Sequence, residues 1–245
     1  MSKIWVIPDI HGCSKTLKVL VENMIVPEKS DHLIFLGDYI DRGPDSKGVI
    51  DYIMGLEEKG HKVTTLMGNH EDYCLTAWED DQNIKGFLGI TPKSKTQREW
   101  ELYGGKQCIQ SFGVERPREI PDKYIDWMKK LQYYVELDDF IVVHAGFNFE
   151  EANPFDDKFS MLWIREFEVI PEKVNNKKII HGHVPVNLEY IDMAVNNPES
   201  KYIDIDNGVY FANRPGYGNL IALELTNMEY TAHSLMDTVE YKKFL

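Results

Sequence analysis

The chain has 245 residues, a formal net charge of −13, 43% hydrophobic residues and 12% aromatic residues. This length can bury a core as one large domain or two small ones, and the composition excludes a disordered protein. The surplus of acid argues against binding to a nucleic-acid backbone or to an anionic membrane surface. The three cysteines form no CxxC pair, and the apolar runs are too short to span a bilayer. We therefore expect a cytoplasmic protein with no nucleic-acid or membrane partner.

The first seventy residues alternate strand-like and helix-like patterns. Helices are predicted over 14–26, with Ser14 as N-cap, and from an Asp45 or Ser46 cap to Lys59, where Gly60 ends the helix. Strands are predicted over 3–7, 32–36 and 61–67. This order predicts parallel strands joined by right-handed crossovers.

The segment from about 71 to 131 is predicted to be mainly helical and cap-like, with a loop at 91–95 and a break at Gly104-Gly105. Strand patterns return over 133–137, 140–143, 178–180, 202–205, 220–225 and 229–234. The last two flank residues 226–228 and predict an antiparallel hairpin. The whole predicts one mixed α/β (α+β) domain over 1–245 with two sheets.

Polar residues follow five of the predicted strands. In open α/β sheets, ligands bind in the crevice outside the carboxyl ends of the strands. The alternative is that these are ordinary polar turns, which competes well for any single motif. However, five of the eight histidines fall in these short windows, whereas His32, His61 and His233 do not. The residues concerned are Asp9, His11, Asp38, Asp41, Arg42, Asn69, His70, His144, His181 and His183.

This set of side chains predicts a metal site. Imidazole, carboxylate and amide donors without thiolate suit zinc, iron or manganese. There are more candidate ligands than one ion needs, so two ions are predicted, with Asp38 as the bridging carboxylate because it follows the middle strand. The candidate ligands are Asp9, His11, Asp38, Asn69, His144 and His183.

The motifs DIHG, GDYIDRGPDS, GNHED, HAG and HGHVPV, in this order, resemble those of the calcineurin-like metallophosphoesterases. More narrowly, the chain resembles the phosphoprotein phosphatase group, which includes bacterial and phage serine/threonine phosphatases and symmetrical diadenosine tetraphosphate hydrolases. The resemblance implies two mixed sheets packed as a sandwich and flanked by helices. It also implies that Asp9, His11 and Asp38 hold one metal, and that Asp38, Asn69, His144 and His183 hold the other.

The same resemblance implies that His70, paired with Asp41, protonates the leaving group and that Arg42 binds the phosphate. These roles also make physical sense, because an alkoxide leaves poorly without an acid and a guanidinium matches phosphate oxygens. In the wider superfamily the last motif often carries two histidines, but here Val184-Pro185 follows His183. His181 would therefore lie behind the metal ligands.

Arginine is scarce, with six residues in the chain. Arg165 is a second candidate for the phosphate clamp, because it resembles an arginine near a similar Leu-Trp element in bacterial relatives. The alternative is an exposed charge on a helix whose Leu162 and Trp163 are buried. Arg116 and Arg118 are predicted to be solvated, and Arg214 to lie in a loop.

Three functions remain open at this stage. The first is a dinuclear-metal phosphomonoesterase, most simply a bacterial-type serine/threonine protein phosphatase acting on a phosphorylated protein. The second is a symmetrical dinucleoside polyphosphate hydrolase acting on a small phosphorylated molecule, with a pocket built by about residues 80–118. The third is a catalytically silent scaffold. For the cofactor we expect two divalent ions, manganese first, with iron and zinc open.

Overall fold

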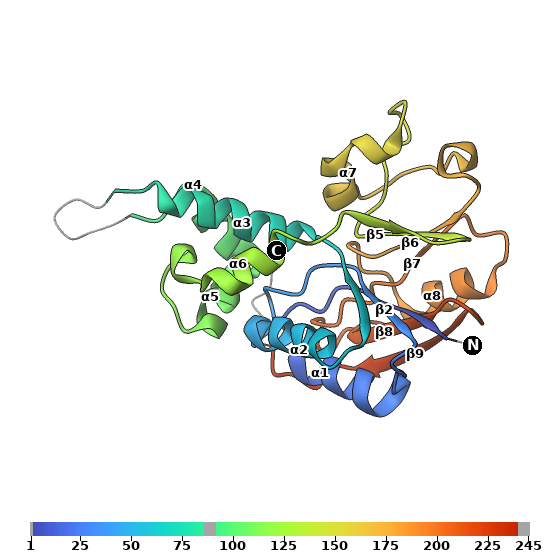
Figure 1. Ribbon diagram of the computed structural model, residues 1–245, viewed down its shortest axis with the longest axis horizontal. Coiled ribbons are helices and arrows are strands. Elements are labelled where there is room, and N and C mark those ends of the chain that lie inside the picture. The colour runs from blue at the N-terminus through green and yellow to red at the C-terminus, as the bar shows by residue number, and fades with distance from the viewer. Residues whose placement is uncertain (1, 86–91, 240–245) are drawn as a thin grey trace.

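The computed structural model describes residues 2–85 and 92–239 (Figure 1). One sheet has five strands in the order β3-β2-β1-β8-β9. β1, β2 and β3 are parallel, β8 runs antiparallel to β1, and β8 and β9 form the predicted hairpin. The strands are β1 (Ile4–Ile7), β2 (His32–Phe35), β3 (Lys62–Thr65), β8 (Asn219–Glu224) and β9 (Glu229–Ser234).

The second sheet has four strands in the order β4-β5-β6-β7. They are β4 (Tyr134–Glu136), β5 (Phe140–Val143), β6 (Lys178–His181) and β7 (Tyr202–Asp204). Buried side chains from both sheets, including Ile34 and Ile221 from one and Val142 and Ile180 from the other, form a shared apolar cluster. The predicted sandwich of two mixed sheets is therefore confirmed.

Helices cover the outer face of the five-stranded sheet. α1 (Ser14–Val19) continues as a π-helical turn (Leu20–Ile25), and α2 (Ser46–Glu58) is capped by the Asp45 carboxylate, which accepts a hydrogen bond from the Gly48 N–H. Leu17 and Ile50 pack with Ile7 in one buried cluster. On the four-stranded side lie α7 (Lys158–Trp163) and α8 (Leu188–Asn196).

The prediction of Ser14 as an N-cap was wrong. α1 begins at Ser14 after Cys13, and the Ser14 hydroxyl donates to Asp45 Oδ2 at 2.5 Å. The first turn is instead satisfied by Asp237, whose carboxylate accepts from the N–H groups of Lys15 and Thr16 at 3.2 and 2.9 Å. A partner more than two hundred residues away gives no local sequence signal.

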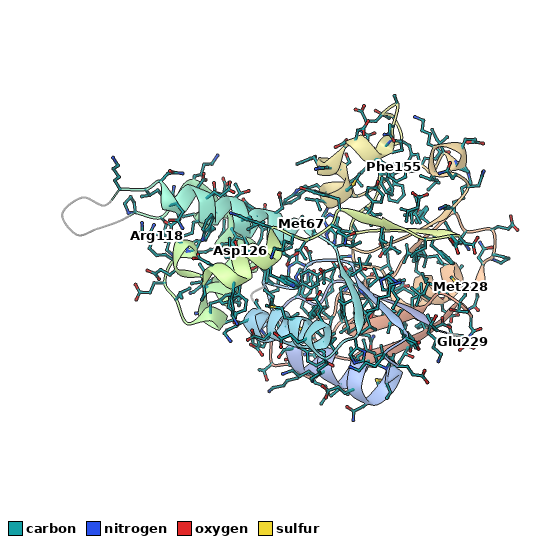
Figure 2. The ribbon with its side chains drawn as sticks, viewed as in Figure 1. Met67, Arg118, Asp126, Phe155, Met228 and Glu229 are labelled. Carbon is teal, nitrogen blue, oxygen red and sulfur yellow. The ribbon has the colours of Figure 1, made fainter. Side chains whose placement is uncertain are left out.

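The segment predicted as helical projects from one side of the sheets, where Figure 2 labels Arg118 and Asp126. The hairpin residues Met228 and Glu229 lie at the opposite end of the molecule, and Met67 lies between the two regions. Trp100, Tyr124 and Met128 belong to the same buried cluster as Ile7 and Leu17. The elements are α3 (Asn69–Gln82), α4 (Lys95–Trp100), a π-helical turn (Glu101–Gly105), α5 (Lys106–Phe112) and α6 (Asp122–Met128).

Two details of this segment refine the predictions. The predicted loop at 91–95 falls partly outside the described residues, and Ser94 caps α4 by accepting from the Gln97 N–H. The predicted break is real, since Gly104 has a φ of 117° inside the π-helical turn. None of the helices in the described ranges combines the length and apolar character of a membrane span.

The prediction that Arg116 and Arg118 are solvated was wrong. Arg116 Nε donates to both carboxylate oxygens of Asp81, at 3.1 and 3.2 Å, and Asp81 is fully buried at the end of α3. Arg118 Nε lies 3.8 Å from the same carboxylate. The two arginines compensate a buried charge that sequence spacing could not place beside them.

Candidate metal centre

The candidate ligands come together where the strands of both sheets end. His11 follows β1, Asp38 follows β2, His144 follows β5 and His183 follows β6, while Asn69 and His70 begin α3 just beyond β3. Three of these residues adopt a left-handed backbone, with φ of 45° at His11, 50° at Asp38 and 78° at His183. Non-glycine residues rarely adopt this conformation, and such residues cluster at functional sites. The tight turns aim the side chains at one point.

Two groups of possible ligand atoms share one carboxylate. The first consists of His11, Asp38 and His70, and the second of Asp38, His144 and His183; within each group the ligand atoms all lie within 4.8 Å of one another. Asp38 is nearly fully buried. The shared position of Asp38 is the one expected of a residue that bridges two ions.

The donor set fits metal binding. The Nδ1 atoms of His11 and His144 lie 3.0 Å from the carbonyl oxygens of Ile40 and Leu36, so these nitrogens carry the protons and each Nε2 keeps its lone pair. These lone pairs point into the centre, where His11 Nε2 lies 2.8 Å from Arg42 Nη1 and His144 Nε2 lies 3.0 Å from Asn69 Oδ1. His183 Nε2 is buried and has no hydrogen-bond partner among the described residues. A buried polar atom without a partner is costly, and an ion would satisfy it.

Asn69 and Asp9 complete the arrangement. Asn69 Oδ1 lies 3.0 Å from both His144 Nε2 and His183 Nδ1. Asp9 lies in neither group of three; its Oδ2 accepts from the His183 N–H at 3.2 Å, and its Oδ1 lies 3.9 Å from His144 Nδ1. The six candidate ligands are therefore brought into one centre, with Asp9 at its edge.

Burial sets the charge state of the centre. It raises the pKa of Asp38 to about 6, and it lowers the pKa of His144 and of His183 to about 3. Neutral imidazole is the form that binds metals. The histidines are therefore already in the ligating form at neutral pH.

The buried Asp41 carboxylate holds the His70 ring in place, and Trp100 donates to the same carboxylate. His70 Nδ1 lies 2.6 Å from Asp41 Oδ2, and the Trp100 indole N–H donates to the same oxygen at 2.7 Å. Burial raises the pKa of Asp41 and lowers the pKa of His70. The backbone N–H of His70 donates to Asp38 Oδ1 at 3.0 Å. This hydrogen bond links the His70–Asp41 pair to the carboxylate that both groups of ligand atoms share.

Trp100 and Glu71 are functional supports that sequence reasoning missed. A buried indole N–H needs an acceptor, but nothing in the sequence shows that Asp41 is the acceptor for Trp100. The buried Glu71 carboxylate accepts from the N–H groups of Asp38, Tyr39 and Ile40, at 2.8, 2.9 and 3.2 Å, and so fixes the turn after β2. Its place three residues after Gly68, as the third residue of α3, was the available signal.

Arg42 is held from three sides. Its Nη1 lies 2.8 Å from His11 Nε2, and its guanidinium lies 4.4 Å from the centre of the Tyr210 ring. Its backbone N–H donates to the Gly104 carbonyl at 3.3 Å. A Cβ on Gly104 would meet Arg42 N at 2.6 Å, so this approach requires glycine. Tyr210 was not predicted, and nothing in the sequence marks it.

A sequence profile described as calcineurin-like phosphoesterase matches residues 2–211. The chain belongs to this family. A symmetrical bis(5'-nucleosyl)-tetraphosphatase of Pseudomonas putida (strain W619) is 30% identical over 144 residues, which is 58% of this chain and 41% of that protein. The namesake from Buchnera aphidicola subsp. Schizaphis graminum is 40% identical over 54% of this chain and 50% of its own length. The matches thus span about half, or less, of these relatives.

Solved structures support the same fold. A protein serine/threonine phosphatase from Saccharomyces cerevisiae superimposes over 99% of this chain and 82% of its own, with a TM-score of 0.61 and 16% identity. At this identity the likeness concerns the arrangement of sheets and helices alone. It agrees with the two-sheet sandwich described above.

Within this calcineurin-like phosphoesterase, Arg165 and His181 belong to neither of the two groups of ligand atoms. Arg165 is exposed and lies beyond the end of α7, not on the helix; its charge nevertheless contributes to the lowered pKa of His183. Its role as a clamp stays a prediction. His181 is buried, its Nδ1 lies 3.2 Å from the Gly182 carbonyl, and its ring packs against Phe167 and Tyr202.

Proposed function

We propose that the chain is a metal-dependent phosphoric ester hydrolase that cleaves dinucleoside polyphosphates symmetrically. The observation that carries the hydrolase is the Asp38 carboxylate shared by two groups of ligand atoms. The relatives named as symmetrical bis(5'-nucleosyl)-tetraphosphatases favour this substrate over the phosphoproteins we first expected.

Each residue of the centre has a chemical task in this proposal. His11 and Asp38, with Asp9 in place of His70, would hold one divalent ion, because His70 is held by Asp41 for another task. Asp38, Asn69, His144 and His183 would hold the other. The pair would supply Lewis-acid stabilisation of the phosphoryl oxygens and a nucleophile at neutral pH. The Arg42 guanidinium would bind equatorial phosphate oxygens through its planar fork.

His70 would deliver a proton to the leaving oxygen from Nε2 when its ring carries both protons, and the Asp41 carboxylate favours that form because it accepts from Nδ1–H. The Trp100 N–H supports the carboxylate in that role. A nucleoside diphosphate is a better leaving group than an alkoxide, so it needs this proton less.

The test is a panel of substrates after removal of metal with EDTA and reconstitution with Mn²⁺. We expect diadenosine tetraphosphate to yield ADP as the nucleotide product, and Asp38→Asn to abolish the reaction. Formation of ATP and AMP from diadenosine tetraphosphate would contradict the symmetrical activity. So would a protein that rapidly dephosphorylates a phosphopeptide but does not hydrolyse diadenosine tetraphosphate.

A second candidate is a serine/threonine phosphatase. The buried His70–Asp41 pair favours it, because general acid catalysis matters most for a poor leaving group such as an alkoxide. Phosphopeptide turnover well above that of diadenosine tetraphosphate would select this function. Purified, metal-loaded protein that hydrolyses no phosphoester would support the silent scaffold.

A further inference from the structure

A pocket lies beside the metal centre, because Arg42 lines it and also contacts His11. It has a volume of about 320 Å³ and is lined by Arg42, Pro44, Gln107, Gln110, Ser111 and Thr238. Arg42 and Pro44 belong to the turn before α2, the next three belong to α5, and Thr238 follows β9. Apart from Arg42, none of these residues takes part in the centre described above.

The walls of this pocket are fixed relative to the metal centre. Arg42 lines the pocket and also places its Nη1 2.8 Å from His11 Nε2. The Ser111 hydroxyl accepts from the Lys47 N–H at 2.8 Å, which joins α5 to α2. Asp237, next to Thr238, is held by the first turn of α1. A phosphate on Arg42 would therefore lie next to a pocket whose walls are already held in place.

Apart from that arginine, the lining residues are uncharged, and all of them except Pro44 have polar side chains. Across the described residues, the side-chain amides of Gln107 and Gln110 make no hydrogen bond, and α5 presents them one turn apart. A glutamine amide offers a donor and an acceptor side by side, the pattern that pairs with the edge of adenine. An uncharged lining next to a phosphate-binding arginine suits the uncharged part of a nucleotide.

We propose that this pocket binds the nucleobase of a nucleotide whose phosphate lies on Arg42. The assignment rests on the dinucleoside polyphosphate activity proposed above, and it adds the residues that would recognise one nucleoside. Gln107 and Gln110 would then contribute to substrate affinity and leave the chemistry of phosphoryl transfer unchanged.

The test measures equilibrium binding by calorimetry to the Mn²⁺-loaded protein. The probes are adenosine 5'-(α,β-methylene)diphosphate, which carries the base, and methylenediphosphonate, which lacks the nucleoside; neither bridge can be hydrolysed. In Gln107→Ala/Gln110→Ala we expect the adenosine probe to bind about tenfold more weakly or worse, given the strength of bidentate contacts to a base. Binding of methylenediphosphonate should not change. Gln82→Ala, an exposed glutamine at the end of α3, is the matched control and should change neither.

Unchanged binding of the adenosine probe to the double variant would overturn the assignment. So would equal weakening of both probes, which would indicate a disturbed Arg42, or no measurable binding of the adenosine probe to the unaltered protein. Hydrolysis of diadenosine tetraphosphate by the same preparations separates the two proposals. If the protein hydrolyses diadenosine tetraphosphate but the double variant binds the adenosine probe normally, only the assignment of the pocket is wrong. If the double variant binds the adenosine probe more weakly but the protein does not hydrolyse diadenosine tetraphosphate, only the proposed symmetrical activity is wrong.

Discussion

The loops at the sheet edge and the projecting helices contribute to the centre in different ways. The loops after β1, β2, β5 and β6, with the start of α3, supply the candidate ligand atoms. The later helices supply none of them within the described residues. They supply instead the contacts that hold those loops, such as the Trp100 N–H on Asp41 and the Gly104 carbonyl on Arg42.

The candidate ligand atoms and the contacts that hold the reacting side chains in place therefore come from different parts of the chain. The ligands sit on tight turns whose geometry is fixed by strand ends and by Glu71. The alignment of His70 and Arg42 depends on residues more distant in the sequence. Variants of the loops should therefore remove the reaction, whereas variants of the helices should weaken it or the fold.

His70→Ala tests the chemical side of this comparison and should lower turnover more than the variants of the helices described below. We expect a loss of about 10²- to 10⁴-fold on phosphoserine, because general acid catalysis contributes this much. The loss on a nitrophenyl ester should be far smaller, since that leaving group needs no acid. Steady-state kinetics on the two substrates measures the ratio, and equal losses would remove His70 from the acid role.

Trp100→Phe tests whether the helices align the centre. The variant keeps an aromatic side chain in the buried site but removes the N–H donated to Asp41 Oδ2. We expect kcat on phosphoserine to fall about 10- to 100-fold, as for other supporting residues of metal centres, with little change on the nitrophenyl ester. Phe112→Leu, on α5, serves as a control for packing changes in this segment. Loss of activity on both substrates alike would mean that Trp100 acts only through the fold.

Arg116→Ala should separate stability from activity within the helical segment. It leaves the buried Asp81 carboxylate without its closest partner, so the free energy of unfolding should fall by about 3 kcal/mol. Activity per folded molecule should stay nearly constant. Arg118→Ala, 3.8 Å from the same carboxylate, should cost less than about 1 kcal/mol. Denaturant titration measures both, and equal costs would contradict the assignment of Arg116 as the main partner.

The sequence predicted the sheet-edge region better than the helical one. Alternating strand and helix patterns located the strands of both sheets, and turns such as GDYIDRG located the residues at their ends. Partners far apart in the sequence could not be predicted in this way. The Asp237 cap on α1, the Asp81–Arg116 pair and the stacking of Tyr210 on Arg42 exist only after the chain has folded.

Metal stoichiometry tests the central claim, that Asp38 joins two metal sites. After dialysis against excess Mn²⁺ and removal of unbound metal, elemental analysis should find about two ions per chain, as in other two-metal centres. His11→Ala and His183→Ala should each lose about one ion, since each residue belongs to one of the two groups. Asp38→Asn should lose both. Retention of one full ion by Asp38→Asn, equal to that in His183→Ala, would contradict the shared carboxylate and the account built on it.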